Sequence, residues 1–207
     1  MKQPLGVILA GGLATRMGGG DKGLLELGGV PILQRVIDRL SPQVGQVALN
    51  ANGDPVRFAG YDLPVIADSI EGYAGPLAGV LAGLDWAVDQ GADAIVTAAA
   101  DTPFFPCDLV PQLVLAAENA SAQIALAATP DPDRGTVRHP TFGLWPTALR
   151  DDLRAALQDG LRKVVLWTDR HGAGTAVFQT RAGDPFFNVN TPDDLAQAQK
   201  MLGDGVA

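Results

Sequence analysis

The sequence contains one cysteine and two histidines in 207 residues. A lone Cys107 excludes an internal disulfide and any cysteine-rich metal site, and its neighbours Pro106 and Asp108 give no sign of an activated thiol. His139 and His171 lie far apart along the chain, which leaves little scope for a histidine-based catalytic triad or a zinc site. Any chemistry therefore has to rest on other side chains.

Basic residues are also scarce: 15 Lys and Arg against 23 Asp and Glu give a formal net charge of -8 and a pI of about 4.6. Such a chain would be repelled by nucleic acid and by anionic membranes, so an anionic ligand has to be met locally. The N-terminal segment 1–9 lacks the apolar length of a signal peptide or a spanning helix, and we expect a cytoplasmic protein. Its 47% hydrophobic residues and its length suit one compact domain, residues 1–207.

Short apolar runs alternate with helical patterns along the chain. Strands are expected at 5–10, 46–50, 63–67, 94–100, 124–128, 141–145 and 175–179, and helices at 31–40, 76–88, 107–119, 149–158 and 192–202. Segment 163–170 suits either state. The alternation predicts a three-layer, Rossmann-like α/β fold with a mostly parallel central sheet and helices on both faces. Ligands then belong at the carboxyl ends of the strands.

A glycine-rich segment, Leu9 to Lys22, follows the first expected strand, with five glycines and two cations in fourteen residues. Glycines let backbone N–H groups turn toward an anion, while Arg16 offers a planar fork and Lys22 a point charge. We interpret the segment as a phosphate cradle; the alternative is a flexible surface loop.

Two other phosphate motifs do not fit this segment. Residues 18–23 match the dinucleotide pattern G-x-G-x-x-G, but they begin eight residues beyond Ala10, and the second strand ends without the acidic residue that would bind a ribose. A P-loop is excluded because no Gly-Lys-Ser or Gly-Lys-Thr occurs anywhere in the chain.

Two aspartates come directly after expected strands. Asp101 follows 94–100 and precedes Thr102-Pro103, where a carboxylate could hold Mg²⁺ together with substrate phosphates; a turn or capping role is equally compatible with the residues alone. Asp68 follows 63–67, where it suits either a ribose or base contact or simply the end of a strand.

Taken together, these residues resemble molybdenum cofactor guanylyltransferases, within the larger fold of nucleotide-sugar-type nucleotidyltransferases. The resemblance covers nearly the whole chain. Its motifs are Leu9-Ala10-Gly11-Gly12 with Arg16-Met17-Gly18 and Asp21-Lys22, Asn50-Ala51-Asn52, Asp68 with Gly75-Pro76-Leu77-Ala78-Gly79, Asp101-Thr102-Pro103, His139-Pro140, and Asn188-Val189-Asn190-Thr191-Pro192.

The resemblance implies a Mg²⁺-dependent transfer of GMP from GTP to the terminal phosphate of molybdopterin, or molybdenum-molybdopterin, with release of pyrophosphate. Residues 1–102 would mainly bind the nucleotide and 103–207 mainly the acceptor. The implied nucleotide contacts are Leu9, Ala10, Gly11, Gly12, Asn50 and Asp68 for the nucleoside side, Arg16 and Lys22 for the phosphates, and Asp101 for the metal. The implied catalytic residues are Arg16, Lys22 and Asp101.

On the acceptor side the resemblance implies contacts from Arg162, Lys163, Asn188 and Asn190. Lys163 stands where the family commonly has arginine, and lysine lacks the bidentate fork for a phosphate. His139 is interpreted as a structural or acceptor-loop residue. An acceptor phosphate is already anionic, so the step needs alignment and charge neutralisation rather than a general base.

Two alternatives remain at this point: a CTP-dependent cytidylyltransferase of the same fold, and a non-catalytic nucleotide-binding module. Gly11-Gly12 argues mildly against the first, because relatives that use CTP more often have alanine before the second glycine. Asp101 together with both cations disfavours the second. Contacts with proteins of cofactor biosynthesis and molybdoenzyme maturation are also expected.

Overall fold

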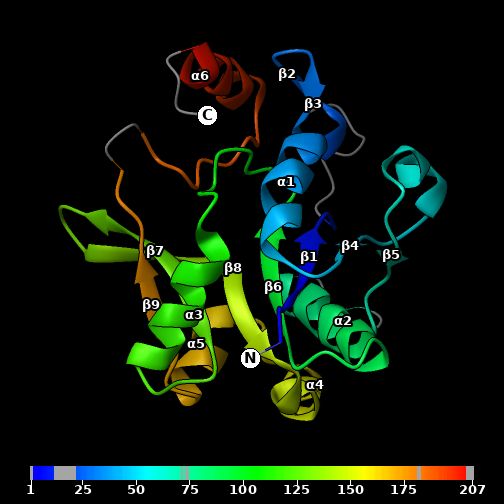
Figure 1. Cartoon of the computed structure of the whole chain (residues 1–207), viewed down its shortest axis with the longest axis vertical. Helices are drawn as coiled ribbons and strands as arrows, with labels where there is room; N and C mark the ends of the chain where they lie inside the picture. Colours follow the sequence, from blue (N-terminus) through cyan, green and yellow to red (C-terminus); the bar gives the residue numbers. More distant parts are fainter. Residues whose placement is uncertain (1, 12–21, 71, 73–74, 181–182, 204–207) are drawn as a thin grey trace.

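The computed structural model describes residues 2–11, 22–70, 72, 75–180 and 183–203. Its main sheet has seven strands in the order β5-β4-β1-β6-β8-β7-β9 (Figure 1). The strands are β1 (Leu5–Leu9), β4 (Val47–Asn50), β5 (Val65–Ile66), β6 (Ala94–Ala99), β7 (Ala125–Asp131), β8 (Gly135–Pro146) and β9 (Gly174–Val177). The α-helices are α1 (Ile32–Leu40), α2 (Pro76–Asp89), α3 (Leu109–Asn119), α4 (Arg150–Gln158), α5 (Val164–Arg170) and α6 (Pro192–Gly203). The 3-10 helices are η2 (Lys22–Leu24), η3 (Ser41–Gln43), η4 (Pro55–Tyr61) and η5 (Thr147–Leu149).

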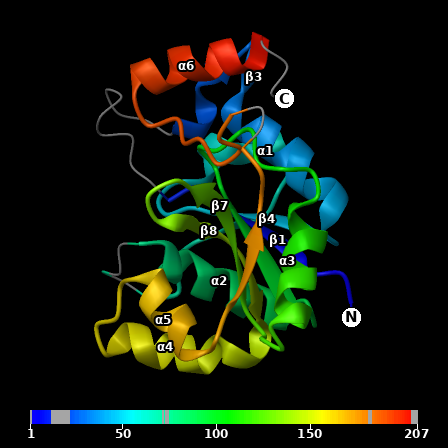
Figure 2. The ribbon, with the colours of Figure 1, turned by 90° about the vertical axis from the view of Figure 1, so that its left-hand side faces the viewer.

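The predicted three-layer arrangement is confirmed. One apolar cluster joins the sheet to α1 and α3, and a second joins its other face to α2, α4 and α5. Figure 2 shows the sheet between these two helical layers, with α6 above its upper edge. Strands β1 and β6 are buried along almost their whole length, which explains their continuous apolar sequences.

All strand pairings in this sheet are parallel except the two made by β8. Strands β7 and β8 form a hairpin, and both are longer than the sequence predicted. A register shift between Leu126 and Ala127 interrupts their pairing. Trp145 on β8 is fully buried, and its indole N–H donates to Thr97 Oγ1 on β6 at 2.9 Å. The hairpin is therefore fixed against the centre of the sheet.

The ambiguous segment 163–170 is helical. Trp167 decides this, because in a helix its ring lies against Trp145 at a centroid distance of 6.2 Å while its Nε1–H donates to Asp152 on α4 at 2.7 Å. Tertiary packing thus selects between two states that the local sequence allows equally.

A short hairpin, β2 (Glu26–Leu27) and β3 (Val30–Pro31), was not predicted from the sequence. Gly28 and Gly29 form its turn with φ of 60° and 75°, a backbone conformation that favours glycine. Pro31 therefore ends a strand, and the helix begins one residue later than expected. Leu27 and Ile32 pack with Ala198 of α6 in a third apolar cluster.

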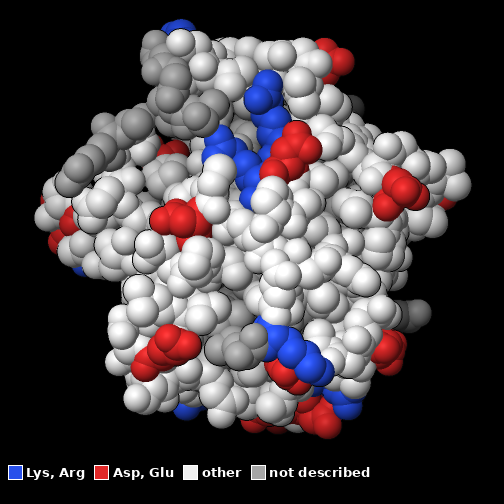
Figure 3. Space-filling view, in the orientation of Figure 1, with Lys and Arg blue, Asp and Glu red and all other residues white. Residues whose placement is uncertain are grey.

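Basic and acidic side chains are mixed on the face shown in Figure 3, where one basic group lies over α1 and another lies near the bottom of the view, each beside acidic side chains. Two basic residues of α1 have structural partners: Arg35 donates to Leu27 O, and Arg39 donates to Phe105 O. None of the described helices combines the length and hydrophobicity that a membrane crossing requires.

Candidate functional site

Strands β4, β1 and β6 are adjacent and parallel, so their carboxyl ends lie side by side at one end of the sheet. Ala10 N donates to Asn50 O at 2.8 Å, and Ala100 N donates to Leu9 O at 3.1 Å. Leu9 and Ala10 are partly buried and Gly11 is exposed. The start of the glycine segment is therefore held in the sheet by these backbone hydrogen bonds, and the chain reaches the surface at Gly11. Gly12 and Arg16 lie outside the described residues, and Lys22 begins η2 with a side chain that is likewise not described.

Asn50, Asn52 and Asp68 form a hydrogen-bonded group at the ends of β4 and β5. Asn50 is only 4% exposed, and its Nδ2 donates to Ile66 O at 3.2 Å and to Asp68 Oδ1 at 3.0 Å. Asn52 Nδ2 donates to Asp68 Oδ2 at 2.8 Å, while its Oδ1 accepts from Asp68 N at 2.9 Å. An ionised carboxylate has about four acceptor positions, so Asp68 is oriented here and still has capacity for a ligand.

Gly79 on α2 permits this arrangement. A Cβ at that position would lie 2.2 Å from Asn50 Oδ1 and 2.8 Å from Leu9 Cδ2, closer than real Cβ contacts. The first turns of α2 can therefore pack directly over two predicted nucleoside contacts. This close approach explains why the first turn of α2 contains glycine, a residue of low helix propensity.

Asp101 and Asn188, far apart in sequence, are joined through the buried Thr102. Thr102 Oγ1 lies 2.5 Å from Asn188 Oδ1 and 3.3 Å from Asp101 Oδ1, and Val189 N donates to Asp101 O at 2.8 Å. A hydroxyl has one proton for these two oxygens, so the Asn188 amide can instead donate to Oγ1 in the flipped orientation. The predicted metal residue and the predicted acceptor segment thus meet in one place.

Segment 188–191 is fixed from its other end by α6. Asp194 Oδ2 accepts from Asn190 N and Thr191 N, each at 2.9 Å, and Asp194 N donates to Thr191 Oγ1 at 3.2 Å. This reciprocal capping orders the backbone that carries Asn190.

His139 lies on β8 and stacks on Phe186, with ring centroids 4.3 Å apart. Its Nε2 is 2.9 Å from Thr129 Oγ1. Burial lowers the pKa of His139 below its usual range, and the Asp184 carboxylate partly offsets that effect. The neutral imidazole is part of the aromatic packing around Phe186, which includes Phe142 and Phe178.

Arg162 and Lys163 are anchored elsewhere, between α4 and α5. Arg162 Nη1 donates to Leu157 O at 3.1 Å and to Leu161 O at 2.8 Å, so it caps the end of α4, while Lys163 is exposed at the start of α5. The two predicted acceptor segments are therefore held by different parts of the molecule.

The sequence assigned no role to Asn52, Thr102, Ser69 or Asp85. Asn52 and Thr102 lie within the motifs Asn50-Ala51-Asn52 and Asp101-Thr102-Pro103, and this was the feature of the sequence that could have indicated a role for them. Ser69 Oγ donates to Asp85 Oδ2 at 2.5 Å, a contact that no sequence spacing indicates.

A carboxylate, the kind of ligand that a hard cation binds, lies just after β6. Among the residues that the structure describes, no three His, Cys, Asp or Glu side chains form a metal-binding group. Mg²⁺ typically takes one or two carboxylates and completes its shell with waters and substrate phosphates. The Asp101 carboxylate, partly exposed at the sheet edge, fits that pattern.

Comparison with known proteins gives concordant matches. The family model described as the MobA-like NTP transferase domain matches residues 6–173. A Mesorhizobium japonicum protein named molybdenum cofactor guanylyltransferase is 50% identical over 202 residues, which cover 95% of each chain. A Rhodopseudomonas palustris protein of the same name is 52% identical over 198 residues, 94% of this chain and 92% of its own.

A solved structure shares the fold. The crystal structure of molybdopterin-guanine dinucleotide biosynthesis protein A from Archaeoglobus fulgidus is similar with a TM-score of 0.73 at 24% identity, covering 96% of this chain and 98% of that one. Likeness at this identity concerns the fold alone.

Proposed function

Because this chain belongs to the MobA-like NTP transferase domain family, we propose that it is a molybdenum cofactor guanylyltransferase. It transfers GMP from GTP to the terminal phosphate of molybdopterin or molybdenum-molybdopterin, forming the guanine dinucleotide cofactor and pyrophosphate. The observation that carries the proposal is identity of about half of all positions, over nearly the full length, with relatives of that name.

For the donor, we propose that Asn50 and Asp68 contact the nucleoside and that Leu9, Ala10 and Gly11 line it with backbone groups. The hydrogen bonds from Asn50 and Asn52 to Asp68 support this assignment, because they hold the carboxylate in one orientation before the ligand arrives. Gly12 belongs to the same proposed lining. Arg16 and Lys22 would bind the phosphates, as their charge and their place in the glycine segment suggest.

Asp101 is proposed to hold Mg²⁺. Bound there, the ion would neutralise charge on the phosphates and on the pyrophosphate leaving group. What supports this assignment is the position of the carboxylate after β6 and its link through Thr102 to Asn188. Asn188 and Asn190 would orient the acceptor, and Arg162 with Lys163 would contribute from between α4 and α5.

The acceptor phosphate is the nucleophile. One of its oxygens attacks the α-phosphorus of GTP, and the bond from that phosphorus to the bridging oxygen of pyrophosphate breaks. Because the acceptor is already anionic, alignment by the two sides of the site suffices without a general base.

The same reaction implies neighbours in the cell. The acceptor is the product of an earlier biosynthetic step and the product is a cofactor for molybdoenzymes. We therefore include in the proposal contacts with cofactor-biosynthesis and molybdoenzyme maturation proteins, and a cytoplasmic location.

The deciding experiment supplies purified protein with Mg²⁺, molybdopterin and either GTP or CTP. We expect a guanine dinucleotide and pyrophosphate in the GTP reaction. Formation of a cytosine dinucleotide in preference would identify a cytidylyltransferase, and binding of nucleotide with no product from either would identify a non-catalytic module.

A further inference from the structure

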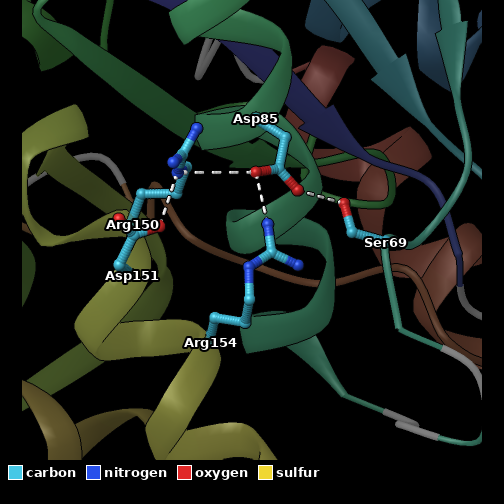
Figure 4. A network of polar contacts seen from close by, with 5 residues as sticks. All are labelled: Ser69, Asp85, Arg150, Asp151 and Arg154. Carbon is cyan, nitrogen blue, oxygen red and sulfur yellow. Dashed lines mark hydrogen bonds and ion pairs between the residues drawn. The ribbon is translucent and has the colours of Figure 1, made fainter.

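Asp85, in the middle of α2, joins the loop after β5 to α4 (Figure 4). Its Oδ2 accepts the hydroxyl proton of Ser69 at 2.5 Å, and its Oδ1 accepts from Arg154 Nη2 at 2.6 Å. Arg150 Nε lies 3.8 Å from the same Oδ1. The Asp85 side chain is 26% exposed, so water screens these contacts only in part.

The contact with Ser69 holds the loop that follows β5 against the side of α2. Asp85 lies nine residues after Pro76, the first residue of α2. At a rise of about 1.5 Å per residue, that is about 14 Å along the helix axis. The start of the loop is thus bound beside the third turn of α2 rather than at its N-terminus.

Ser69 directly follows Asp68, the carboxylate that Asn50 and Asn52 orient. The side chains of Asp68 and Ser69 therefore tie this segment to two places: to the end of β4 through the asparagines, and to α2 through Asp85. Loss of the Ser69–Asp85 contact removes the hydrogen bond that holds this segment on α2 and leaves the three hydrogen bonds between Asp68 and the asparagines.

We propose that Asp85 is a positioning residue for GTP: held by Arg154, it binds Ser69 and thereby fixes Asp68 where the nucleoside is bound. This inference rests on the proposed function and extends it to Ser69, Asp85 and Arg154, which would act through Asp68 without touching the ligand. The proposed effect concerns binding of the nucleoside part of GTP, and binding of the triphosphate part should not depend on Asp85.

A purely structural role for the group is a weaker account. Partly exposed ion pairs such as Asp85 with Arg154 contribute little to folding stability, and holding α2 against α4 does not require a partner on the loop after β5. Ile70, which packs against the apolar cluster of α2, anchors the loop independently of charge, so we expect substitutions at Ser69 or Asp85 to leave the fold intact.

The test measures equilibrium binding of GTP and of inorganic pyrophosphate, each with Mg²⁺, by calorimetry. We expect Ser69→Ala and Asp85→Asn to raise the dissociation constant of GTP about threefold to tenfold, the usual consequence of one lost hydrogen bond. The dissociation constant of pyrophosphate should stay unchanged. In turnover, KM for GTP should rise by a similar factor while kcat changes less than about twofold.

Two matched variants serve as controls. Ser69→Thr keeps the hydroxyl at an exposed position and should restore wild-type GTP affinity. Asp89→Asn removes the same charge one turn further along α2, at an exposed residue, and should leave both dissociation constants unchanged. Thermal unfolding of each variant establishes that it is folded.

The positioning role would be overturned if the variants weakened binding of GTP and of pyrophosphate equally, or if GTP binding were unchanged in both Ser69→Ala and Asp85→Asn. In either case, turnover by the wild-type protein would still uphold the proposed function. A wild-type protein that binds no GTP would overturn the two together.

Discussion

Asp101 has a partly exposed side chain, and its backbone carbonyl accepts a hydrogen bond from Val189 N. We expect Asp101→Asn to lower pyrophosphate release from GTP at least about 100-fold, because the amide keeps the shape but loses the charge that would hold a cation. A pyrophosphate assay measures this loss. Asp159→Asn, an exposed substitution after α4, is the matched control, and retained activity in Asp101→Asn would remove this residue from the metal role.

His139 predicts a pH dependence of stability. Its pKa in the folded protein lies below the ordinary value of 6.5, so between the two pKa values the unfolded chain binds more protons. The stabilisation is complete above about pH 6.5 and is lost as the pH falls. Denaturant unfolding from pH 7 to pH 5 should therefore lose more free energy in the wild type than in His139→Gln. Equal losses would exclude the imidazole as the cause.

At the level of single residues, Asp68 and Asp101 were recognised in the sequence because each follows an expected strand, whereas the role of Asn50 was implied only by the family resemblance. The sequence could not indicate Thr102 as the link to Asn188, or Asp85 as the partner of Ser69. Those contacts depend on which loops the folded chain brings together, and no local pattern records that.

Among the elements, α2 is constrained most closely by its neighbours. Gly79→Ala places a Cβ against Asn50 Oδ1 and Leu9, which should cost about 1–3 kcal/mol of folding free energy, more than the helix propensity of alanine returns. It should also weaken GTP binding by displacing Asn50. Thermal unfolding and calorimetry measure the two effects.

Gly203→Ala is the matched control for that substitution. A Cβ at Gly203, at the end of α6, would meet nothing within 4 Å. Its stability should stay within about 0.5 kcal/mol of the wild type. If Gly79→Ala were equally harmless, the close approach of α2 to Asn50 would not matter for stability.

The elements also show how far sequence reasoning reaches. Strands 5–10 and 94–100 were predicted almost to the residue because they are buried on both sides and are apolar without interruption. The β2–β3 hairpin was missed although Gly28-Gly29 is a turn signal, because each strand has only two residues. Helix α5 depended on Trp145 and Asp152, which lie in other elements.

For the whole molecule, ligand binding should appear as added stability. With Mg²⁺ present, GTP at about 100 times its dissociation constant should add about 2.7 kcal/mol. For a chain of this size that corresponds to a rise in Tm of about 5–10 °C. CTP and ATP at equal concentration should give smaller shifts, measured by differential scanning calorimetry. Equal shifts for all three nucleotides would contradict guanine selectivity.

The place of β8 in the sheet has a consequence for synthesis on the ribosome. Strands β1, β4, β5 and β6 are adjacent in the sheet and all end before residue 100, so they can pair once this part of the chain has left the ribosome. The outer edge of β6, however, is covered by β8, which begins only at Gly135. After β6 has left the ribosome and before β8 has followed it, the nascent chain therefore carries an apolar strand with an open edge, a feature that promotes aggregation. Pairing of β8, within the β7–β8 hairpin, with β6 ends that exposure.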